Sequence, residues 1–270
     1  MSLLVTEPDT AVSRSSSPVA IETRDLSQVF LTKQGPVHAL ERVDLTVRRG
    51  EFVSVVGPSG CGKSTLLRIV AGLERHTFGE VEVDGAPVSK PRTDVGIVFQ
   101  RDALLDWRTA LENVLLQVDM RRKRTRADVE RARELLASVG LQGFEDALPG
   151  QLSGGMRQRV SICRALILEP DVLLMDEPMS ALDALTREQL MVDLQEMVAR
   201  NGMSVLFITH SIPEAVFLGD RVVVMGARPG RLIEEIVVPF ERPRSLRLLA
   251  DPEFNDMATR IRSLLGEIPA

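Results

Sequence analysis

Short apolar runs alternate with amphipathic stretches over much of the chain and predict alternating strands and helices. Three apolar runs have the length and composition of buried strands, at 171–175, 204–209 and 221–225. The run 51–56 is a fourth strand, and the helical pattern of 64–71 follows it and ends at Gly72. This order of elements predicts a doubly wound α/β core with a parallel sheet.

Two regions depart from that alternation. Residues 21–56 are rich in strand patterns, with clear alternation over 39–47, and 80–85 is another short strand that ends in a turn. Residues of about 101–160 are mainly helical, since apolar side chains recur at helical spacing before the stop at Gly140. We therefore expect an additional β-rich part and a helical insert around the core.

A glycine-rich segment lies between the strand 51–56 and the helix that follows it. Glycines allow phosphate oxygens to approach successive backbone N–H groups, and the start of the helix adds its partial positive charge. Lys63 is placed to reach the β- and γ-phosphates of a nucleotide, and the Ser64 hydroxyl is placed to bind Mg²⁺. The segment matches G-x-x-x-x-G-K-[ST] and predicts a nucleotide-phosphate site made of Gly57, Pro58, Ser59, Gly60, Cys61, Gly62, Lys63, Ser64 and Thr65.

The amino-acid composition and net charge limit the classes of protein to which the chain can belong. The chain has 270 residues, of which 44% are hydrophobic and 26% charged, as in an ordinary globular protein. Its net charge of −5 argues against a protein-wide basic field for nucleic acid. Its two cysteines, Cys61 and Cys163, fall in the phosphate loop and in an expected helix, which argues against a structural disulfide and favours the cytoplasm. We expect a disordered tail over 1–20, and we expect that no apolar segment crosses a membrane.

Two carboxylates follow the apolar strand at 171–175. In an open parallel sheet, ligands bind at the carboxyl ends of the strands, where Asp176 and Glu177 lie. We expect Asp176 to orient Mg²⁺ and Glu177 to polarise an attacking water. The alternative is that two acidic residues simply close a strand before Pro178.

The segment 152–159, Leu-Ser-Gly-Gly-Met-Arg-Gln-Arg, forms a third motif. Ser153 has the character of a helix N-cap, and Gly154 and Gly155 leave backbone N–H groups uncovered, although a plain capped helix has the same pattern. The segment, which includes Gln158, resembles the signature motif of ABC-type ATPases. That resemblance implies that this site closes on the γ-phosphate held by another subunit, so that a homodimer encloses two ATP–Mg²⁺.

The resemblance extends to three further positions. Gln100 resembles the glutamine loop, whose side chain approaches Mg²⁺, and Asp183 resembles the aspartate that bridges two nucleotide sites. His210 resembles the switch histidine that contacts the γ-phosphate, although a lone histidine after a strand is more often structural. The fold implied is an α/β P-loop NTPase core of RecA type, with an antiparallel β subdomain and a helical insert.

One aromatic position departs from the family pattern. Members usually stack adenine on Tyr or Trp in the first strand region, and this chain has no tyrosine. Phe30 is the candidate substitute because it still offers a π-face. The alternative is a phenylalanine buried in the core.

The segment 99–114 and the motifs Arg-Pro-Gly-Arg at 228–231 and Glu-Arg-Pro-Arg at 241–244 resemble the ATPases of nitrate, sulfonate and taurine importers. Those importers commonly have Pro where this chain has Asp106. The resemblance implies permease subunits in the membrane, an indirect link to a periplasmic or lipid-anchored solute-binding protein, and a place at the cytoplasmic face of the inner membrane. Trp107 then either docks on the permease or fills a gap between lobes.

We expect the ATPase domain to span 21–245 and a helical appendage to span 246–270, with an apolar stripe that packs on the core. The basic run 121–126 is expected to be a solvated helix end rather than a lipid or nucleic-acid contact. Two other classes stay open at this stage. A non-transport ABC ATPase of DNA repair or the ribosome has the same motifs, and a phosphoryl transferase shares the phosphate loop and makes a phosphorylated product.

Overall fold

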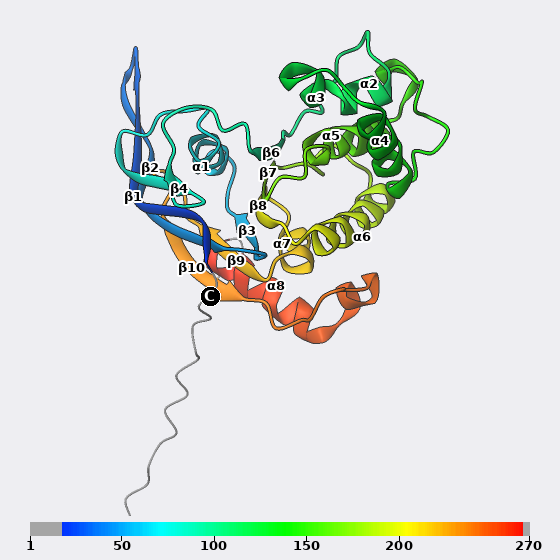
Figure 1. The fold of residues 1–270 in the computed structure, drawn as a ribbon. Coiled ribbons are helices and arrows are strands. Elements are labelled where there is room, and N and C mark those ends of the chain that lie inside the picture. The colour runs from blue at the N-terminus through cyan, green and yellow to red at the C-terminus, as the bar shows by residue number, and fades with distance from the viewer. Residues whose placement is uncertain (1–17, 267–270) are drawn as a thin grey trace, which may run out of the picture.

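The computed structural model describes residues 18–266, which form two β-sheets with helices around them (Figure 1). The predicted tail therefore lies mostly outside the described residues, and the first strand begins at Val19, within the last residues of the expected span 1–20. The smaller sheet is antiparallel, in the order β2-β1-β4-β5. Its strands are β1 (Val19–Thr32), β2 (Gly35–Arg48), β4 (Phe78–Val83) and β5 (Ala86–Pro87).

The larger sheet has six strands in the order β10-β9-β3-β8-β7-β6, and all neighbours are parallel except β10 and β9. Consecutive residues of its central strands point to opposite faces, and both faces are buried, as in a doubly wound sheet. The strands are β3 (Phe52–Val56), β6 (Val95–Val98), β7 (Val172–Asp176), β8 (Ser204–Thr209), β9 (Arg221–Met225) and β10 (Leu232–Val237).

One face of the larger sheet is covered by helix α1 (Lys63–Val70), which also packs against β2 and β4 of the smaller sheet. Its side chains Leu66, Leu67 and Val70 belong to a core shared by both sheets. Helix α1 therefore joins the two sheets and places the loop before it, 57–62, at the carboxyl end of β3.

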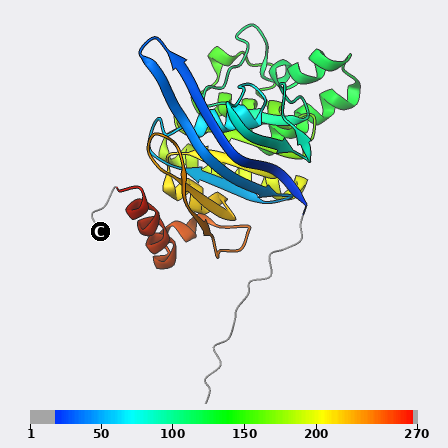
Figure 2. The same ribbon diagram turned by 90° about the vertical axis from the view of Figure 1, so that its left-hand side faces the viewer.

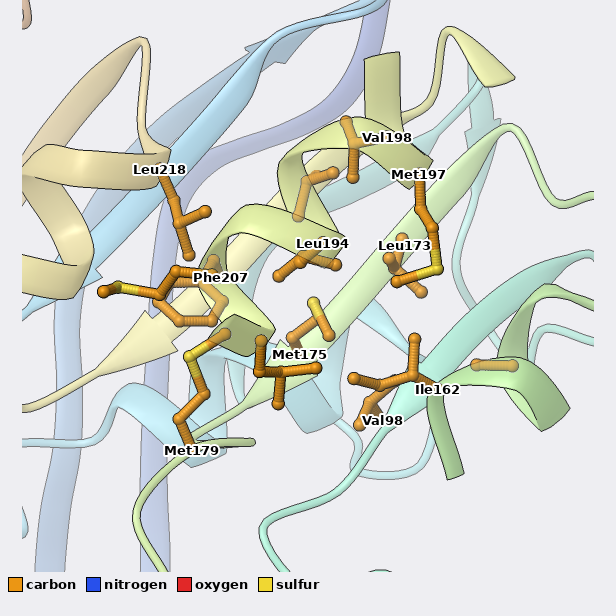
Figure 3. Close-up of a cluster of buried hydrophobic side chains, with 14 of the residues drawn as sticks. Val98, Ile162, Leu173, Met175, Met179, Leu194, Met197, Val198, Phe207 and Leu218 are labelled. Carbon is orange, nitrogen blue, oxygen red and sulfur yellow. The ribbon is translucent and has the colours of Figure 1, made fainter. Parts of the chain in front are cut away.

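The other face carries most of the helices. Figure 3 shows how Leu173, Met175 and Phe207 of the sheet pack against Leu194 and Met197 of helix α6. The helices are α2 (Ala110–Val114), α3 (Leu116–Arg121), α4 (Arg126–Ser138), α5 (Gly154–Leu166), α6 (Ala184–Asn201), α7 (Ile212–Leu218) and α8 (Pro252–Leu264), with short 3-10 turns at Pro149–Gln151 and Leu246–Ala250.

The predicted helical insert is present, with boundaries that differ from the expectation. Its first helix begins at Ala110, where Thr109 and Glu112 form a capping box, and α5 continues to Leu166. The basic run 121–126 extends from the last residue of α3 to the first residue of α4, and it is exposed as expected. Arg122 pairs with Asp128 at 2.6 Å, so part of its charge is locally compensated.

Helix α8 packs against α7, and its side chains Phe254, Ala258 and Ile261 are buried. Figure 2 shows α8 as the red helix at one edge of the molecule. Packing on the core is therefore confirmed for the predicted apolar stripe. Before α8, the buried Arg244 side chain donates hydrogen bonds to the carbonyls of Val216, Phe217 and Gly219 at the end of α7. The segment after β10 is thus attached to the domain by polar as well as apolar contacts.

Candidate functional site

The loop 57–62 requires glycine because it packs closely against neighbouring segments of the chain, in addition to any requirement set by a bound ligand. A Cβ on Gly57 would lie 2.6 Å from the carbonyl oxygen of Met225. Gly62 has φ +102, and its Cβ would lie 2.6 Å from the Ala39 carbonyl oxygen. Both distances are shorter than any normal contact, so larger residues would push the loop away from β9 and β2.

Lys63 begins α1 and is buried, with 4% of its surface exposed. Its Nζ donates to the carbonyl oxygens of Gly57 at 2.7 Å and Pro58 at 3.1 Å. A buried ammonium requires such partners, because desolvation without hydrogen bonds is costly. The positive charge is therefore held inside the loop, where an anionic phosphate would meet it.

Ser64 and Asp176 come from different elements and meet at the next position. Ser64 Oγ donates to Asp176 Oδ1 at 2.9 Å. Burial raises the pKa of the Asp176 carboxyl, the hydrogen bond from Ser64 opposes this shift, and the nearby Glu177 charge adds to it. Two oxygen ligands of this kind fit Mg²⁺, which commonly keeps waters and phosphate oxygens as its other ligands. Within residues 18–266, no three or more His, Cys, Asp or Glu side chains are grouped so that they could hold a metal ion by themselves.

Glu177 follows β7 and is contacted by two of the predicted site residues. Its Oε2 lies 3.0 Å from His210 Nδ1 and accepts from Gln100 Nε2 at 3.4 Å. Its backbone has φ +46, an unfavourable value for a residue with a side chain. The structure therefore brings together three of the predicted site residues, Gln100, Glu177 and His210, from the ends of β6, β7 and β8.

A cavity of about 420 Å³ opens beside the loop, and six of the nine predicted phosphate-loop residues line it. Phe30 is half-buried and lines it, so the alternative of a core phenylalanine is wrong. Arg228 also lines it and was not among the predicted site residues, although its motif was noticed. The lining consists of Phe30, Val37, Ala39, Ser59, Gly60, Gly62, Lys63, Ser64, Thr65, Gln100, Glu177 and Arg228.

The signature segment does not line this cavity. Ser153 caps α5 by accepting from the Met156 N–H at 3.2 Å, as its N-cap character predicted. Gly154 is exposed, with only the end of Arg157 within 4 Å of a Cβ built there. Gln158 is buried within the same chain, with 4% of its surface exposed. The cavity lining and the signature segment therefore come from different parts of the chain.

Asp183 directly precedes helix α6, whose first turn contacts the signature segment. It caps α6 by accepting from the Thr186 N–H at 3.0 Å, and hydrogen bonds to Thr186 lower the pKa of its carboxyl. A Cβ on Gly155 would lie 2.5 Å from Thr186 Cγ2. The start of α5 and the start of α6 are therefore in close contact, which the sequence did not indicate.

Both cysteines are buried and free, as expected from the sequence. Cys61 lies in the phosphate loop, where burial raises the pKa of its thiol and the Lys63 charge opposes the shift. Burial raises the pKa of Cys163 to about 12. Neither thiol is poised as a nucleophile.

A second cavity, of about 440 Å³, lies between the β6 edge and α3. It is lined mainly by apolar side chains, among them Ile97, Phe99 and Met120. Trp107, in the loop before α2, is 75% exposed, so its alternative role as a filler between lobes is wrong. No helix within residues 18–266 is long and apolar enough to span a bilayer.

Comparison with known proteins agrees with this geometry. The sequence profile of the family described as ABC transporter matches residues 40–180. The bicarbonate transport ATP-binding protein CmpD of Synechocystis sp. is 46% identical over 251 residues, which cover 92% of this chain and 89% of that protein. The taurine import ATP-binding protein TauB of Rhizobium johnstonii is 46% identical over 247 residues, which cover 88% of this chain and 94% of that protein.

Solved structures give the same result for the fold. A dimeric structure of the ATP-binding cassette MJ0796 in a post-hydrolysis state, bound to ADP and Pi, superposes with a TM-score of 0.73 at 34% sequence identity. The match covers 82% of this chain and all of that one. The predicted core with its antiparallel subdomain and helical insert is therefore confirmed.

Proposed function

This chain belongs to the ABC transporter family of ATP-binding proteins, and from that premise we propose that it is the ATP-hydrolysing subunit of a bacterial importer for a small anionic solute. The observation that carries the proposal is the cavity in which Phe30, Lys63 and Glu177 converge on one space. The names of two relatives, for bicarbonate transport and taurine import, support the solute class, since each solute carries a compact anionic group.

The residues of the cavity divide the chemistry among them. The loop N–H groups and Lys63 bind the phosphates, while Phe30 offers its ring to adenine. Glu177 accepts the proton of the attacking water, and His210 and Gln100 hold the carboxylate in place through Oε2. Ser64 and Asp176, with Gln100 nearby, would hold Mg²⁺, which neutralises phosphate charge when bound.

The signature segment supplies its chemistry to a second copy. Ser153 and Gly154 are exposed and lie outside their own cavity, so their free N–H groups are available to a phosphate on another chain. A homodimer in which each signature faces the partner's phosphate loop fits this arrangement, with Asp183 near the junction. The dimeric state of the similar cassette MJ0796 supports it.

The apolar cavity beside α3 and the exposed Trp107 form the surface that we assign to the permease. Phe99, which lines this cavity, directly precedes Gln100, so a movement of Gln100 on nucleotide binding would reach the membrane subunits. The similarity to import ATP-binding proteins supports a peripheral position at the cytoplasmic face of the inner membrane, where the permease would provide the membrane contact. The solute-binding protein would act through the permease and contact this chain only indirectly.

One experiment tests the whole proposal. Tagged Glu177→Gln protein is captured from detergent-solubilised native membranes with ATP and Mg²⁺, and the captured proteins are identified by mass spectrometry. We expect a stoichiometric polytopic membrane protein, and less of it with the additional change Trp107→Ala. Recovery of ribosomes or DNA in its place would instead support a non-transport ABC ATPase.

A further inference from the structure

The turn between β9 and β10 lies over the phosphate loop. It contains the motif Arg-Pro-Gly-Arg at 228–231, and the Gly226 N–H closes it by donating to the Arg231 carbonyl at 2.9 Å. Strand β9 is parallel to β3, so the turn emerges at the same edge of the sheet as the loop 57–62. The motif therefore reaches the nucleotide cavity although it is far from the phosphate loop in sequence.

The turn is fixed against two neighbouring segments. The Gly230 N–H donates to the Ala39 carbonyl at 3.0 Å, and the Gly230 carbonyl accepts from the Glu41 N–H at 2.9 Å. A Cβ on Gly230 would lie 2.0 Å from the Cys61 carbonyl oxygen, so only glycine permits this approach. The backbone of the turn is thus wedged between β2 and the phosphate loop.

The two arginines of the motif differ in their partners. Arg231 pairs at 2.6 Å with Glu41, which lies in β2. Arg228 donates from Nε to the Gly60 carbonyl at 2.8 Å, and its Nη2 lies 2.8 Å from the position of a Cβ on Gly60. No carboxylate among residues 18–266 forms an ion pair with Arg228 within 4.0 Å, so its charge is uncompensated at the cavity wall.

We propose that Arg228 is a nucleotide-binding residue that donates from its Nη groups to the phosphate oxygens of ATP. A guanidinium presents its donors as a planar fork that matches phosphate oxygens. The bond from Nε to Gly60 aims that fork at the loop whose N–H groups bind the same phosphates. The other cation of the cavity, Lys63, is already bonded to loop carbonyls, and Arg228 adds a second positive charge from the open side.

This inference rests on the proposed ATPase function and predicts a phosphate-dependent loss of affinity. The full chain with Arg228→Gln is compared with wild type for ATP, ADP and adenosine by isothermal titration calorimetry. We expect ATP and ADP to bind about tenfold more weakly, as for the loss of one charged hydrogen bond, and adenosine to bind unchanged. Arg228→Lys should recover part of the loss because it keeps the charge without the fork.

The matched control is Arg231→Gln, which removes the paired arginine of the same turn and should leave all affinities within twofold of wild type. Equal losses for both variants, accompanied by equal falls in melting temperature, would overturn the proposal in favour of a purely structural turn. A loss for adenosine as large as for ATP would also overturn it, since the contact would then be to the nucleoside. If wild type itself fails to bind ATP, the ATPase proposal fails; if only the Arg228→Gln effect is missing, this inference alone fails.

Discussion

His210 Nδ1 lies 3.0 Å from Glu177 Oε2, although the two residues follow different strands. The strands β7 and β8 are adjacent and parallel, and the Glu177 N–H donates to the Ile208 carbonyl at 2.8 Å. This hydrogen bond fixes the position of the Glu177 backbone relative to strand β8 at the edge of the sheet. The contact between the carboxylate and the imidazole is therefore set by strand register rather than by loop flexibility.

Replacing Glu177 by Gln tests whether this carboxylate is the general base. Gln keeps an oxygen that can accept from His210 and Gln100, so the local geometry should persist while the proton acceptor is lost. We expect ATP hydrolysis to fall about 100-fold or more, the usual contribution of a general base. Phosphate release measures the rate, and titration calorimetry should show that ATP still binds.

Glu241→Gln, on an exposed residue outside the cavity, is the control and should hydrolyse ATP at the wild-type rate. With ATP bound, the Glu177→Gln protein should also elute as a dimer in size-exclusion chromatography. Unchanged hydrolysis in the Glu177→Gln protein would remove Glu177 from the mechanism.

The second prediction concerns Gly155, whose Cβ position lies 2.5 Å from Thr186 Cγ2. Gly155→Ala should push Thr186 away from the cap made by Asp183 and lower the free energy of unfolding by about 1–3 kcal/mol, as overpacking does. Adding Thr186→Ser removes the Cγ2 methyl and should restore most of the loss. Urea unfolding without nucleotide measures both.

Gly154→Ala is the neighbouring control. A Cβ there has only the end of Arg157 near it, at 3.9 Å, so stability should be unchanged or slightly improved by the better helix former. If the double variant is no more stable than Gly155→Ala alone, the contact with Thr186 is not the cause.

Local sequence patterns were sufficient for much of the fold and the site. The strands at Ser204–Thr209 and Arg221–Met225 were predicted at their observed bounds, because short apolar runs between polar turns have few alternatives. The phosphate loop and the pair Asp176 and Glu177 were found because their chemistry requires residues at fixed local spacing. These features depend on interactions within a few residues of one another.

Features that depend on distant segments were not predictable in the same way. The approach of Arg228 to Gly60 joins residues 168 positions apart, and no local pattern encodes it. The exposure of Trp107 depends on what packs around it, so the sequence left a filler role open. The sequence likewise left two positions open for Phe30, the nucleotide site and the core. The structure places Phe30 in the smaller sheet, where it lines the cavity beside the phosphate loop.

The third prediction uses pH to test the buried Glu214 at the start of α7. Burial raises the pKa of this carboxyl above its ordinary 4.5, and hydrogen bonding from Thr209 and the Arg187 charge oppose the shift. The folded protein therefore holds this proton more tightly than the unfolded chain, and the contribution of Glu214 to stability falls as pH rises from 4.5 through the raised pKa. Glu214→Gln has no such step, so its stability relative to wild type should increase over that interval.

Urea unfolding of both proteins at several pH values gives the difference directly, and effects common to all other carboxyls cancel. Glu253→Gln, on an exposed residue of α8, should show no comparable trend. A stability difference between wild type and Glu214→Gln that is constant with pH would show that the carboxyl titrates alike in the folded and unfolded chains.

The last prediction concerns Arg244, which joins the segment after β10 to the end of α7. Its Nη1 donates to the carbonyls of Val216, Phe217 and Gly219 at 2.8–3.0 Å, and these are groups that a helix end leaves without partners. Burial lowers the pKa of the guanidinium to about 10, which still leaves it charged at neutral pH. The side chain therefore acts as a buried cap for α7.

Arg244→Met keeps much of the apolar volume but removes every donor. We expect the free energy of unfolding to fall by about 3 kcal/mol or more, because several buried carbonyls lose their partner at once. Arg244→Lys should recover only part of it, since a single ammonium cannot reach all of these carbonyls. Arg247→Met, on the exposed side of the same segment, should change stability by less than about 0.5 kcal/mol. Equal effects of the changes at Arg244 and Arg247 would mean that water replaces the lost donors and that α7 does not depend on this cap.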